Sequence, residues 1–468
     1  MRIRSFSVQG YRSLLDVTLD DLGPINVFYG ENGAGKSNLL QAMTLAVRTI
    51  EHLATYNAHE LIPGPVPAEH LASASDFHPH TSTIRLLLHL TGVDRPAFRY
   101  LAWSADEVLL SVCLERPGGP VVASFDSLRL RRTGSPSDLE LVPAPGLSAE
   151  EQWGRELTAA GWRGDAPNYR TFRTHLQRFL AEVVGAQTWR IVPAIRTLDP
   201  LVPASSPPHR ASESAAVDAL LRRGRIVEAM FLAHTSSDPK LRRGFEQLRD
   251  MLTAPPLSRP RFDPVLDRAT DTYALQEVRD LDVGPVGMPV ANEGLGIQNI
   301  YVILGFLILG QSFAVAVEEP EAHLHAPTTG RHLRELLTSA IDKGYVKQLF
   351  IATHSSQFAL DLDGYYDVRL DDERATRVER RADLVDLDRR HVEEPGATLR
   401  ALLVSLRDVG DLDAAEPIAF RPDGSPVSVH EMILGLQTHD AAAMEFLDAV
   451  TAAAVRSVVL AARRRARA

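Results

Sequence analysis

The sequence has a single cysteine, Cys113, among its 468 residues, so the chain cannot form an intramolecular disulfide bond. This composition fits the reducing cytoplasm, where we expect the chain to reside, although a secreted protein without disulfides would look the same. The N-terminal residues Met1–Ser5 lead straight into alternating sequence, without the apolar core of a signal peptide. Lysine is scarce as well: the only lysines are Lys36, Lys240, Lys343 and Lys347, and arginine supplies the remaining positive charge.

Long hydrophobic runs are also lacking, with one exception. Residues Ile300–Val317 carry no charge and approach the roughly 18 residues at which a membrane span becomes conceivable. Residues Gly310–Ser312 interrupt the run, which continues directly into Glu318 and Glu319. We therefore predict a buried helix, a turn and a buried strand here, and no membrane segment.

The remaining composition is typical of a globular protein. Apolar residues make up 45% of the chain and charged residues 24%. The length suggests about two to four structural units. A net charge of −10 argues against a surface that is basic throughout, but it is compatible with a local basic patch that contacts nucleic acid.

A glycine-rich motif with the spacing Gly30-x4-Gly35-Lys36-Ser37 lies between a short apolar strand, Ile25–Tyr29, and an amphipathic helix. In this context glycine allows successive backbone N–H groups to curl around phosphate oxygens, and the helix start adds its positive dipole end. Lys36 should bridge the β- and γ-phosphates, while the Ser37 hydroxyl should ligate Mg²⁺. The motif therefore predicts an ATP and Mg²⁺ site, formed by Gly30, Asn32, Gly33, Ala34, Gly35, Lys36, Ser37 and Asn38.

Two adjacent carboxylates follow the apolar run Phe313–Val317, which has the length of a buried strand. A magnesium ion opposite Ser37 needs an anionic ligand, and an attacking water needs a base. We predict that Glu318 is the metal ligand and that Glu319 is the catalytic base. Taken without the phosphate loop, two acidic residues after a strand would more often belong to a solvated loop.

A histidine, His354, follows the buried strand Gln348–Ala352. At the carboxyl end of a strand a histidine can donate a hydrogen bond to the γ-phosphate, so we predict a catalytic role for His354. The alternative is a structural histidine. His323 and His325 are interpreted as structural, because no cysteine or third ligand is spaced to complete a metal site with them.

Together these motifs resemble the ATP-binding-cassette class of chromosome-maintenance and defence ATPases: RecF, the SMC heads and especially the OLD-like AAA ATPases. The resemblance is carried by Gly10–Leu14, by the segment from Ile25 to Met43 that contains GENGAGKSNLLQAM, by Glu318–His325 and by Ala352–Phe358. These motifs lie within residues 1–60 and 285–360, and the middle and the tail of the chain have no counterpart. The full set is specific for the class and much less so for one member.

The resemblance implies that two heads sandwich two nucleotides, with a signature segment of one head capping the γ-phosphate bound to the other. The candidate is Asn292–Asn299, in which Gly294, Gly296 and Gln298 would contact the nucleotide. This segment lacks the family's usual serine, and a glycine turn before a helix is the alternative interpretation. Arg12 resembles a phosphate-side arginine of the family. Residues Asp76–His78 lie where the family has a glutamine, and no role is assigned to them.

The implied fold is an α/β head of the ABC type, with a mixed sheet, flanking helices and an antiparallel β subdomain. We predict a mainly helical insertion and a small α-rich region at the C-terminus. The expected domains are residues 1–146, the N-terminal part of the head; 147–280, the insertion; 281–375, the C-terminal part of the head; and 376–468, an interaction region.

The resemblance further implies an ATPase that forms a homodimer or higher oligomer through its ATP sites. The sequence after His354 is too short for the Toprim nuclease domain of full OLD nucleases, so we expect a separate effector protein, a nuclease, in bacterial anti-phage defence. Two alternatives stay open: a RecF-like repair ATPase that clamps DNA, and a scaffold that binds ATP without hydrolysing it. The C-terminal arginines could contact nucleic acid, although a solvated tail is the simpler interpretation. The arginines that would face DNA are Arg222, Arg223, Arg225, Arg242 and Arg243.

Overall fold

The computed structural model divides into two compact units, residues 1–325 with 329–380 and residues 326–328 with 381–468. The description below covers residues 2–55, 65–91, 107–116, 118–131, 139–142, 189–192, 202–203, 212–267, 272–281, 284–310, 312–324, 327–355, 364–381, 417–420 and 426–428, and the single residues 151, 154, 155, 158, 174, 198 and 358.

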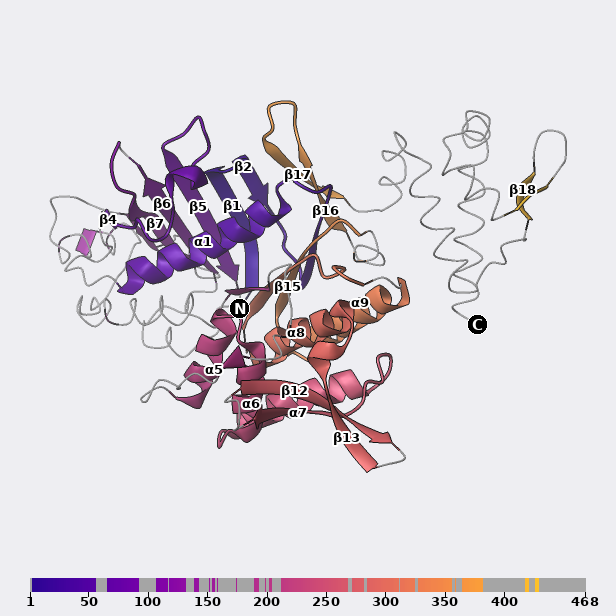
Figure 1. Cartoon of the computed structure of the whole chain (residues 1–468). Helices are drawn as coiled ribbons and strands as arrows, with labels where there is room; N and C mark the ends of the chain where they lie inside the picture. Colours follow the sequence, from indigo (N-terminus) through magenta and orange to yellow (C-terminus); the bar gives the residue numbers. More distant parts are fainter. Residues whose placement is uncertain are drawn as a thin grey trace. The chain divides into compact units, whose positions relative to one another are not determined.

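The centre of the first unit is a six-stranded sheet in the order β17-β16-β3-β15-β14-β9 (Figure 1). Strands β9, β14, β15, β3 and β16 run parallel. The central strands of such a sheet are buried on both faces and are therefore mostly apolar, as in β14 and β15. The strands are β3 (Ile25–Tyr29), β9 (Trp189–Val192), β14 (Ala314–Glu318), β15 (Gln348–Thr353), β16 (Tyr365–Leu370) and β17 (Thr376–Arg381).

An antiparallel sheet in the order β2-β1-β5-β6-β7-β4, with β8 paired to β7, forms the β subdomain. Buried and exposed residues alternate along β5, so one face of the sheet is buried. Helix α1 (Lys36–Thr55) packs against strands of both sheets and fills the core between them. The strands are β1 (Arg2–Tyr11), β2 (Leu14–Leu19), β4 (Val66–Pro67), β5 (Thr83–Thr91), β6 (Glu107–Glu115), β7 (Val122–Arg131) and β8 (Leu139–Leu141), and a short 3-10 turn, η1, spans Ala74–Asp76.

The insertion contains helices and an unexpected sheet. The sequence suggests one helix over residues 215–233, but the structure has two, because Gly224 adopts a left-handed conformation with φ of 73°. Strand β12 pairs with β10, β11 and β13, whereas a mainly helical region is the prediction. The elements are β10 (Val202–Pro203), α5 (Glu213–Arg222), α6 (Ile226–Thr235), α7 (Pro239–Thr253), β11 (Phe262–Asp267), β12 (Thr272–Leu281) and β13 (Gly284–Pro289).

The apolar run Ile300–Val317 forms a buried helix and a buried strand, as predicted. Helix α8 (Leu295–Leu309) follows the 3-10 turn η2 (Val290–Asn292), and β14 comes next. Among the described residues, no helix has the length and apolarity that crossing a membrane requires. Helix α9 (Pro327–Asp342) ends before Gly344, whose φ of 73° marks a left-handed C-terminal cap.

In the second unit the described strands are β18 (Pro417–Phe420) and β19 (Pro426–Ser428), which form an antiparallel pair. The predicted α-rich character of this region lies almost wholly outside the described residues. The same holds for a strand that the sequence pattern indicates at 98–103 and for helices that it indicates at 152–160 and 169–184. The predicted fold class, a mixed α/β head with flanking helices and an antiparallel β subdomain, is confirmed.

Candidate nucleotide-binding site

The glycine-rich loop connects β3 directly to α1, as its sequence predicts. Gly33 and Gly35 have φ values of 81° and 103°, which non-glycine residues rarely adopt. The loop exposes Asn32, Gly33 and Ser37 and buries Gly35. Backbone N–H groups of such a loop, together with the free amides at the start of α1, form an anion-binding cradle.

Lys36 is buried inside this loop, with 6% of its surface exposed. Its Nζ donates hydrogen bonds to the carbonyl oxygens of Gly30 at 2.8 Å and Glu31 at 2.7 Å. Burial lowers the pKa of Lys36 below its ordinary value, against the opposing effect of the nearby carboxylates of Glu319, Glu321 and Glu31. The ammonium group therefore lies in the field of carboxylates that come from distant parts of the sequence.

Strand β17 also holds the phosphate loop in place. The Thr376 hydroxyl donates to the carbonyl of Ala34 at 3.1 Å and lies 2.7 Å from the Ser13 hydroxyl. The Asn38 amide donates to Ser13 Oγ at 2.8 Å. A β-carbon at Gly35 would collide with the Thr376 hydroxyl, so glycine is needed there for space as well as for its φ. The sequence does not predict Thr376 as part of the site.

Arg12 lies at the first turn of α1. Its Nε and Nη2 donate to Asp76 Oδ1 at 2.9 and 2.8 Å, and its Nη1 bonds to the side chains of Asn38, at 3.4 Å, and Gln41. Burial acts to raise the pKa of Asp76, but hydrogen bonds from Ser73 and Arg12 hold it below its ordinary value. The segment to which the sequence assigns no role therefore positions Arg12 beside the phosphate loop.

Glu318 and Glu319 lie at the carboxyl edge of the central sheet. Glu318 is level with Ala352 on β15, and the Glu319 N–H donates to the Ala352 carbonyl at 2.7 Å. Thr353 in turn is level with Tyr29, the last residue before the phosphate loop. The strand register therefore brings the carboxylate pair and the phosphate loop to one edge of the sheet.

The donor set at this edge fits a magnesium ion held jointly with a nucleotide. Mg²⁺ is usually bound by one or two carboxylates, substrate phosphates and water rather than by a cage of side chains. The exposed Ser37 hydroxyl and Glu318 are donors of this kind. Within the described ranges no group of three or more His, Cys, Asp or Glu side chains could hold a metal ion by itself.

His354 follows β15 at the same edge, and its side chain is 50% exposed. Its backbone N–H donates to Glu321 Oε1 at 2.9 Å, and its ring Nδ1 lies 3.2 Å from that oxygen. Glu321 is part of the acidic motif in the sequence but has no predicted role. The structure thus adds a third carboxylate, whose charge also acts to raise the pKa of Lys36.

In the candidate signature segment the exposed Gly294 is the N-cap of α8, and a β-carbon there would meet nothing within 4 Å. Gly296 packs against the loop after Glu319, since its β-carbon would lie 2.6 Å from the carbonyl oxygen of His323. Asn299 donates to the carbonyls of Pro320 at 3.1 Å and Ala322 at 3.0 Å. The segment therefore touches the loop after Glu319 of its own chain.

Gln298, one of the predicted nucleotide ligands, is buried. Its Oε1 accepts from the Leu198 N–H at 3.0 Å, and its Nε2 donates to the carbonyls of Ala291 at 3.0 Å and Glu293 at 2.8 Å. Both ends of the amide are thus used within the chain. The prediction that Gln298 contacts a nucleotide stays a prediction, as do those for Gly294 and Gly296.

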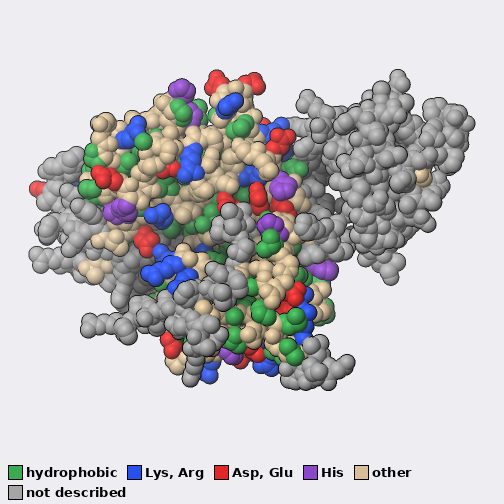
Figure 2. Space-filling view, in the orientation of Figure 1, with side chains coloured by type: hydrophobic (Ala, Val, Ile, Leu, Met, Phe, Trp, Pro, Cys, Tyr) green, Lys and Arg blue, Asp and Glu red, His purple; other side chains and the backbone are tan. Residues whose placement is uncertain are grey.

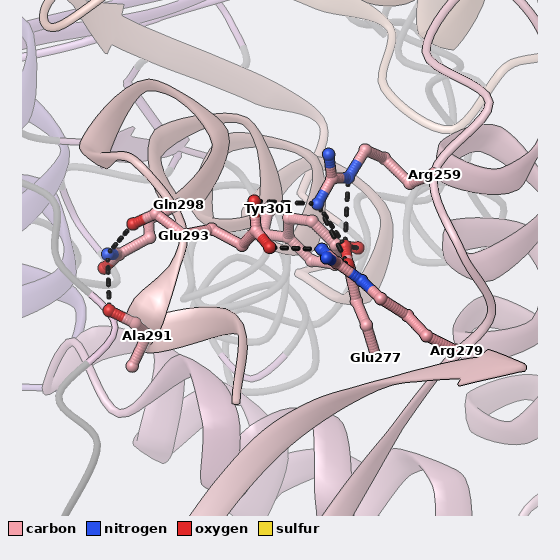
Figure 3. A network of polar contacts seen from close by, with 7 residues as sticks. All are labelled: Arg259, Glu277, Arg279, Ala291, Glu293, Gln298 and Tyr301. Carbon is pink, nitrogen blue, oxygen red and sulfur yellow. Dashed lines mark hydrogen bonds and ion pairs between the residues drawn. The ribbon is translucent and has the colours of Figure 1, made fainter. Parts of the chain in front are cut away.

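A buried ion cluster supports the same segment (Figure 3). Glu277 on β12, only 1% exposed, accepts hydrogen bonds from Arg259, Arg279 and Tyr301. Both arginines also pair with Glu293, Arg259 at 3.1 Å. Because Glu293 is the second residue of the candidate signature segment, the insertion contacts the start of that segment through this cluster.

Comparison with known proteins gives a consistent but partial likeness. Residues 5–49, which contain the phosphate loop, match a family described as an AAA domain. The chain is 27% identical over 95 residues to the DNA replication and repair protein RecF of Bifidobacterium longum subsp. infantis, and 32% identical over 92 residues to that of Enterococcus faecalis. These matches cover 20% of the chain and span only 23% and 24% of the two relatives.

Among solved structures, SMC heads are similar over most of the chain. An SMC head bound to the C-winged helix domain of ScpA has 14% identity and a TM-score of 0.45, covering 82% of this chain and 98% of that one. The SMC head domain from Thermotoga maritima has 11% identity and a TM-score of 0.39, with coverage of 81% and 98%. An SMC head with an extended coiled coil, bound to the C-terminal domain of ScpA from Pyrococcus furiosus, has 13% identity and a TM-score of 0.41, with coverage of 84% and 98%.

Proposed function

We propose that this protein binds ATP with Mg²⁺ and hydrolyses it. The observation that carries the proposal is the convergence of a buried phosphate-loop lysine with carboxylates from the end of β14. In this assignment the loop amides and Lys36 bind the phosphates, and Ser37 and Glu318 would hold the metal, which neutralises developing phosphate charge. Glu319 is the base that activates water, and His354 donates to the γ-phosphate.

We further propose that two copies assemble around ATP. Helix α8 begins at Leu295, a large apolar residue that is 42% exposed, directly after the exposed Gly294. The N–H groups in the first turn of a helix have no partners within the helix and can bind an anion. A phosphate bound to a second copy could occupy that helix start. Assembly would then depend on nucleotide, and the bound state could be passed on to a partner protein.

The setting that we propose is bacterial anti-phage defence in the cytoplasm, with a separate nuclease as the effector. Support for this setting comes from the resemblance of the sequence motifs to OLD-like ATPases. On the face drawn in Figure 2, acidic and basic side chains are interspersed over the described surface. Co-purification of the chain with its effector, followed by an assay for nucleic-acid cleavage in the presence of ATP, tests this setting.

The ATPase proposal is tested with the substitution Glu319→Gln. Removing the base should lower turnover about 100-fold or more while ATP stays bound, because general base catalysis contributes about 10²–10⁴-fold. Trapped ATP should shift the protein to a dimer in light scattering. Glu335→Gln, at an exposed position of α9, makes the same charge change and should leave turnover unaltered. ATP binding by the wild type without turnover would favour the scaffold alternative.

A second candidate is DNA repair of the RecF kind, which the sequence matches to two RecF proteins favour. Exposed arginines on α7, Arg242 and Arg243, and those near the end of α5, Arg222 and Arg223, would then face DNA. Binding of DNA by the isolated protein that requires ATP and weakens steeply with salt would support this role over the defence role. Charge reversal at Arg242 and Arg243 should then reduce the salt dependence.

A further inference from the structure

The loop after Glu319 is held in a fixed shape although it contains no glycine. Glu319 and His323 have positive φ values of 42° and 63°, which are costly for side chains of this kind. The Glu319 N–H is bonded to β15, and Asn299 on α8 binds the carbonyls on either side of Glu321. Contacts from two elements thus over-determine the loop and, with it, the position of Glu321.

Glu321 points one carboxylate oxygen at the end of β15. Its Oε1 accepts hydrogen bonds from the Thr353 hydroxyl at 2.6 Å and from the His354 N–H at 2.9 Å, and it lies 3.2 Å from His354 Nδ1. The carboxylate is only 12% exposed, while the His354 side chain is half exposed. The backbone N–H and the ring Nδ1 of His354 therefore both lie against the same carboxylate oxygen, while half of the side chain stays exposed.

This contact has a chemical consequence for the imidazole. A carboxylate oxygen can only accept, so the ring nitrogen that faces it carries a proton. Nε2 lies at the opposite edge of the ring, away from Glu321. A carboxylate that holds the far side of a histidine fixes its tautomer and orientation in hydrolases and in metal sites. In metal sites, loss of such a partner costs about 10- to 100-fold in metal affinity or activity.

We propose that Glu321 is a positioning residue for ATP hydrolysis: it holds His354 by Nδ1, so that Nε2 is directed toward the terminal phosphate. The proposal rests on the proposed ATPase function. It assigns to the third carboxylate of the acidic motif a role distinct from metal binding by Glu318 and from water activation by Glu319. It also links α8 to the histidine, because Asn299 binds the backbone carbonyls on both sides of Glu321 and so positions this residue.

A purely structural role for Glu321 makes a different prediction, so a double-mutant cycle separates the two. The variants are Glu321→Gln, His354→Ala and their combination, with Glu335→Gln as the control for charge. A positioning residue should lower kcat about 10- to 100-fold in Glu321→Gln and leave KM for ATP within about twofold. In the His354→Ala background the same change should have no further effect on kcat. Losses that multiply, or full activity in Glu321→Gln, would overturn the proposal.

The ring itself gives a readout that does not need turnover. In protein labelled with ¹⁵N-histidine, the signals of His354 are identified as those missing from His354→Ala. We expect Nδ1 to be protonated in the wild type and the Nδ1–H state to be lost in Glu321→Ala, which removes the acceptor oxygen, with melting temperatures of the folded variants compared by calorimetry. An unprotonated Nδ1 in the wild type would contradict the proposal even in an active enzyme. A wild type with the expected Nδ1–H signal but no ATP turnover would instead contradict the ATPase function.

Discussion

The phosphate loop and the candidate signature segment are both glycine-containing turns that open a helix, yet they are built differently. The loop closes on its own Lys36, and a remote hydrogen bond from Thr376 adds to this local contact. The signature segment is held from outside, by the Glu277 cluster and by the Leu198 N–H, which donates to Gln298. Local sequence therefore determines the first, whereas the second depends on how the insertion packs. Variants in the two should fail in different ways.

The largest effect is expected from breaking the cluster behind the signature segment. Glu277→Gln removes the buried anion that compensates Arg259 and Arg279, and breaking a buried ion pair costs roughly 3–5 kcal/mol of stability. Chemical denaturation of the wild type and the variant measures this loss. Glu246→Gln, at an exposed position of α7, is the matched control and should change stability by less than about 0.5 kcal/mol. Equal stabilities of the two variants would show that the cluster does not fix the segment.

Gly35→Ala should have the next largest effect, on the phosphate loop alone. Its β-carbon would collide with the Thr376 hydroxyl, so we expect ATP affinity to fall about 100-fold, or about 2.7 kcal/mol. Gly33→Ala has a similar positive φ but open space, so it should cost only backbone strain of about 1–2 kcal/mol. Adding Thr376→Ala to Gly35→Ala should recover part of the affinity measured by calorimetry. If the ATP affinity does not recover, the collision with Thr376 is not the cause of the loss.

Gln298→Ala should have a moderate effect, which separates the role of the signature segment from that of the phosphate loop. It leaves the Leu198 N–H and the carbonyls of Ala291 and Glu293 without their partner, at a cost of about 1–3 kcal/mol in stability. ATP binding by the monomer should be unchanged, because the phosphate loop is intact, and ATP-driven dimerisation should weaken. Analytical ultracentrifugation with and without ATP checks this. Unchanged ATP-driven dimerisation would show that the segment is not part of the assembly interface.

The smallest effect concerns Arg12 and its partner. The pKa of Asp76 is held below its ordinary value, so the ionised carboxylate stabilises the folded state above the ordinary pKa. That contribution is lost as the pH falls through the lowered folded value. For this solvent-accessible pair we expect about 0.5 kcal/mol. The difference in unfolding free energy between wild type and Asp76→Asn should therefore be present at neutral pH and vanish in acid. A difference independent of pH would contradict the assignment.

The sequence was sufficient for the core of the site because the relevant signals are local. Glycine spacing between an apolar strand and a helix predicts the phosphate loop, and the carboxyl ends of parallel strands necessarily meet at one edge. Strand β3 and helix α1 begin at the residues that the pattern indicates. Glu319 and Lys36 are brought within electrostatic reach by register alone.

What the sequence could not supply depends on long-range packing. Thr376 contributes through a partner 342 residues away along the chain, and Glu277 through partners on neighbouring elements, and nothing next to either residue marks a role. Strand β12 was missed because its apolar residues Leu275, Val278 and Leu281 also fit a helical period. The break between α5 and α6, in contrast, had a visible signal, because Gly224 is a common helix terminator.

The most direct test of the central claim is calorimetric titration of the wild-type protein with ATP, in the presence and absence of Mg²⁺. The account predicts saturable binding that is tightened by magnesium, and loss of binding in Lys36→Ala at unchanged secondary structure by circular dichroism. Absence of ATP binding in the folded wild type would contradict the account. So would an ATP affinity that changes neither with magnesium nor in Lys36→Ala.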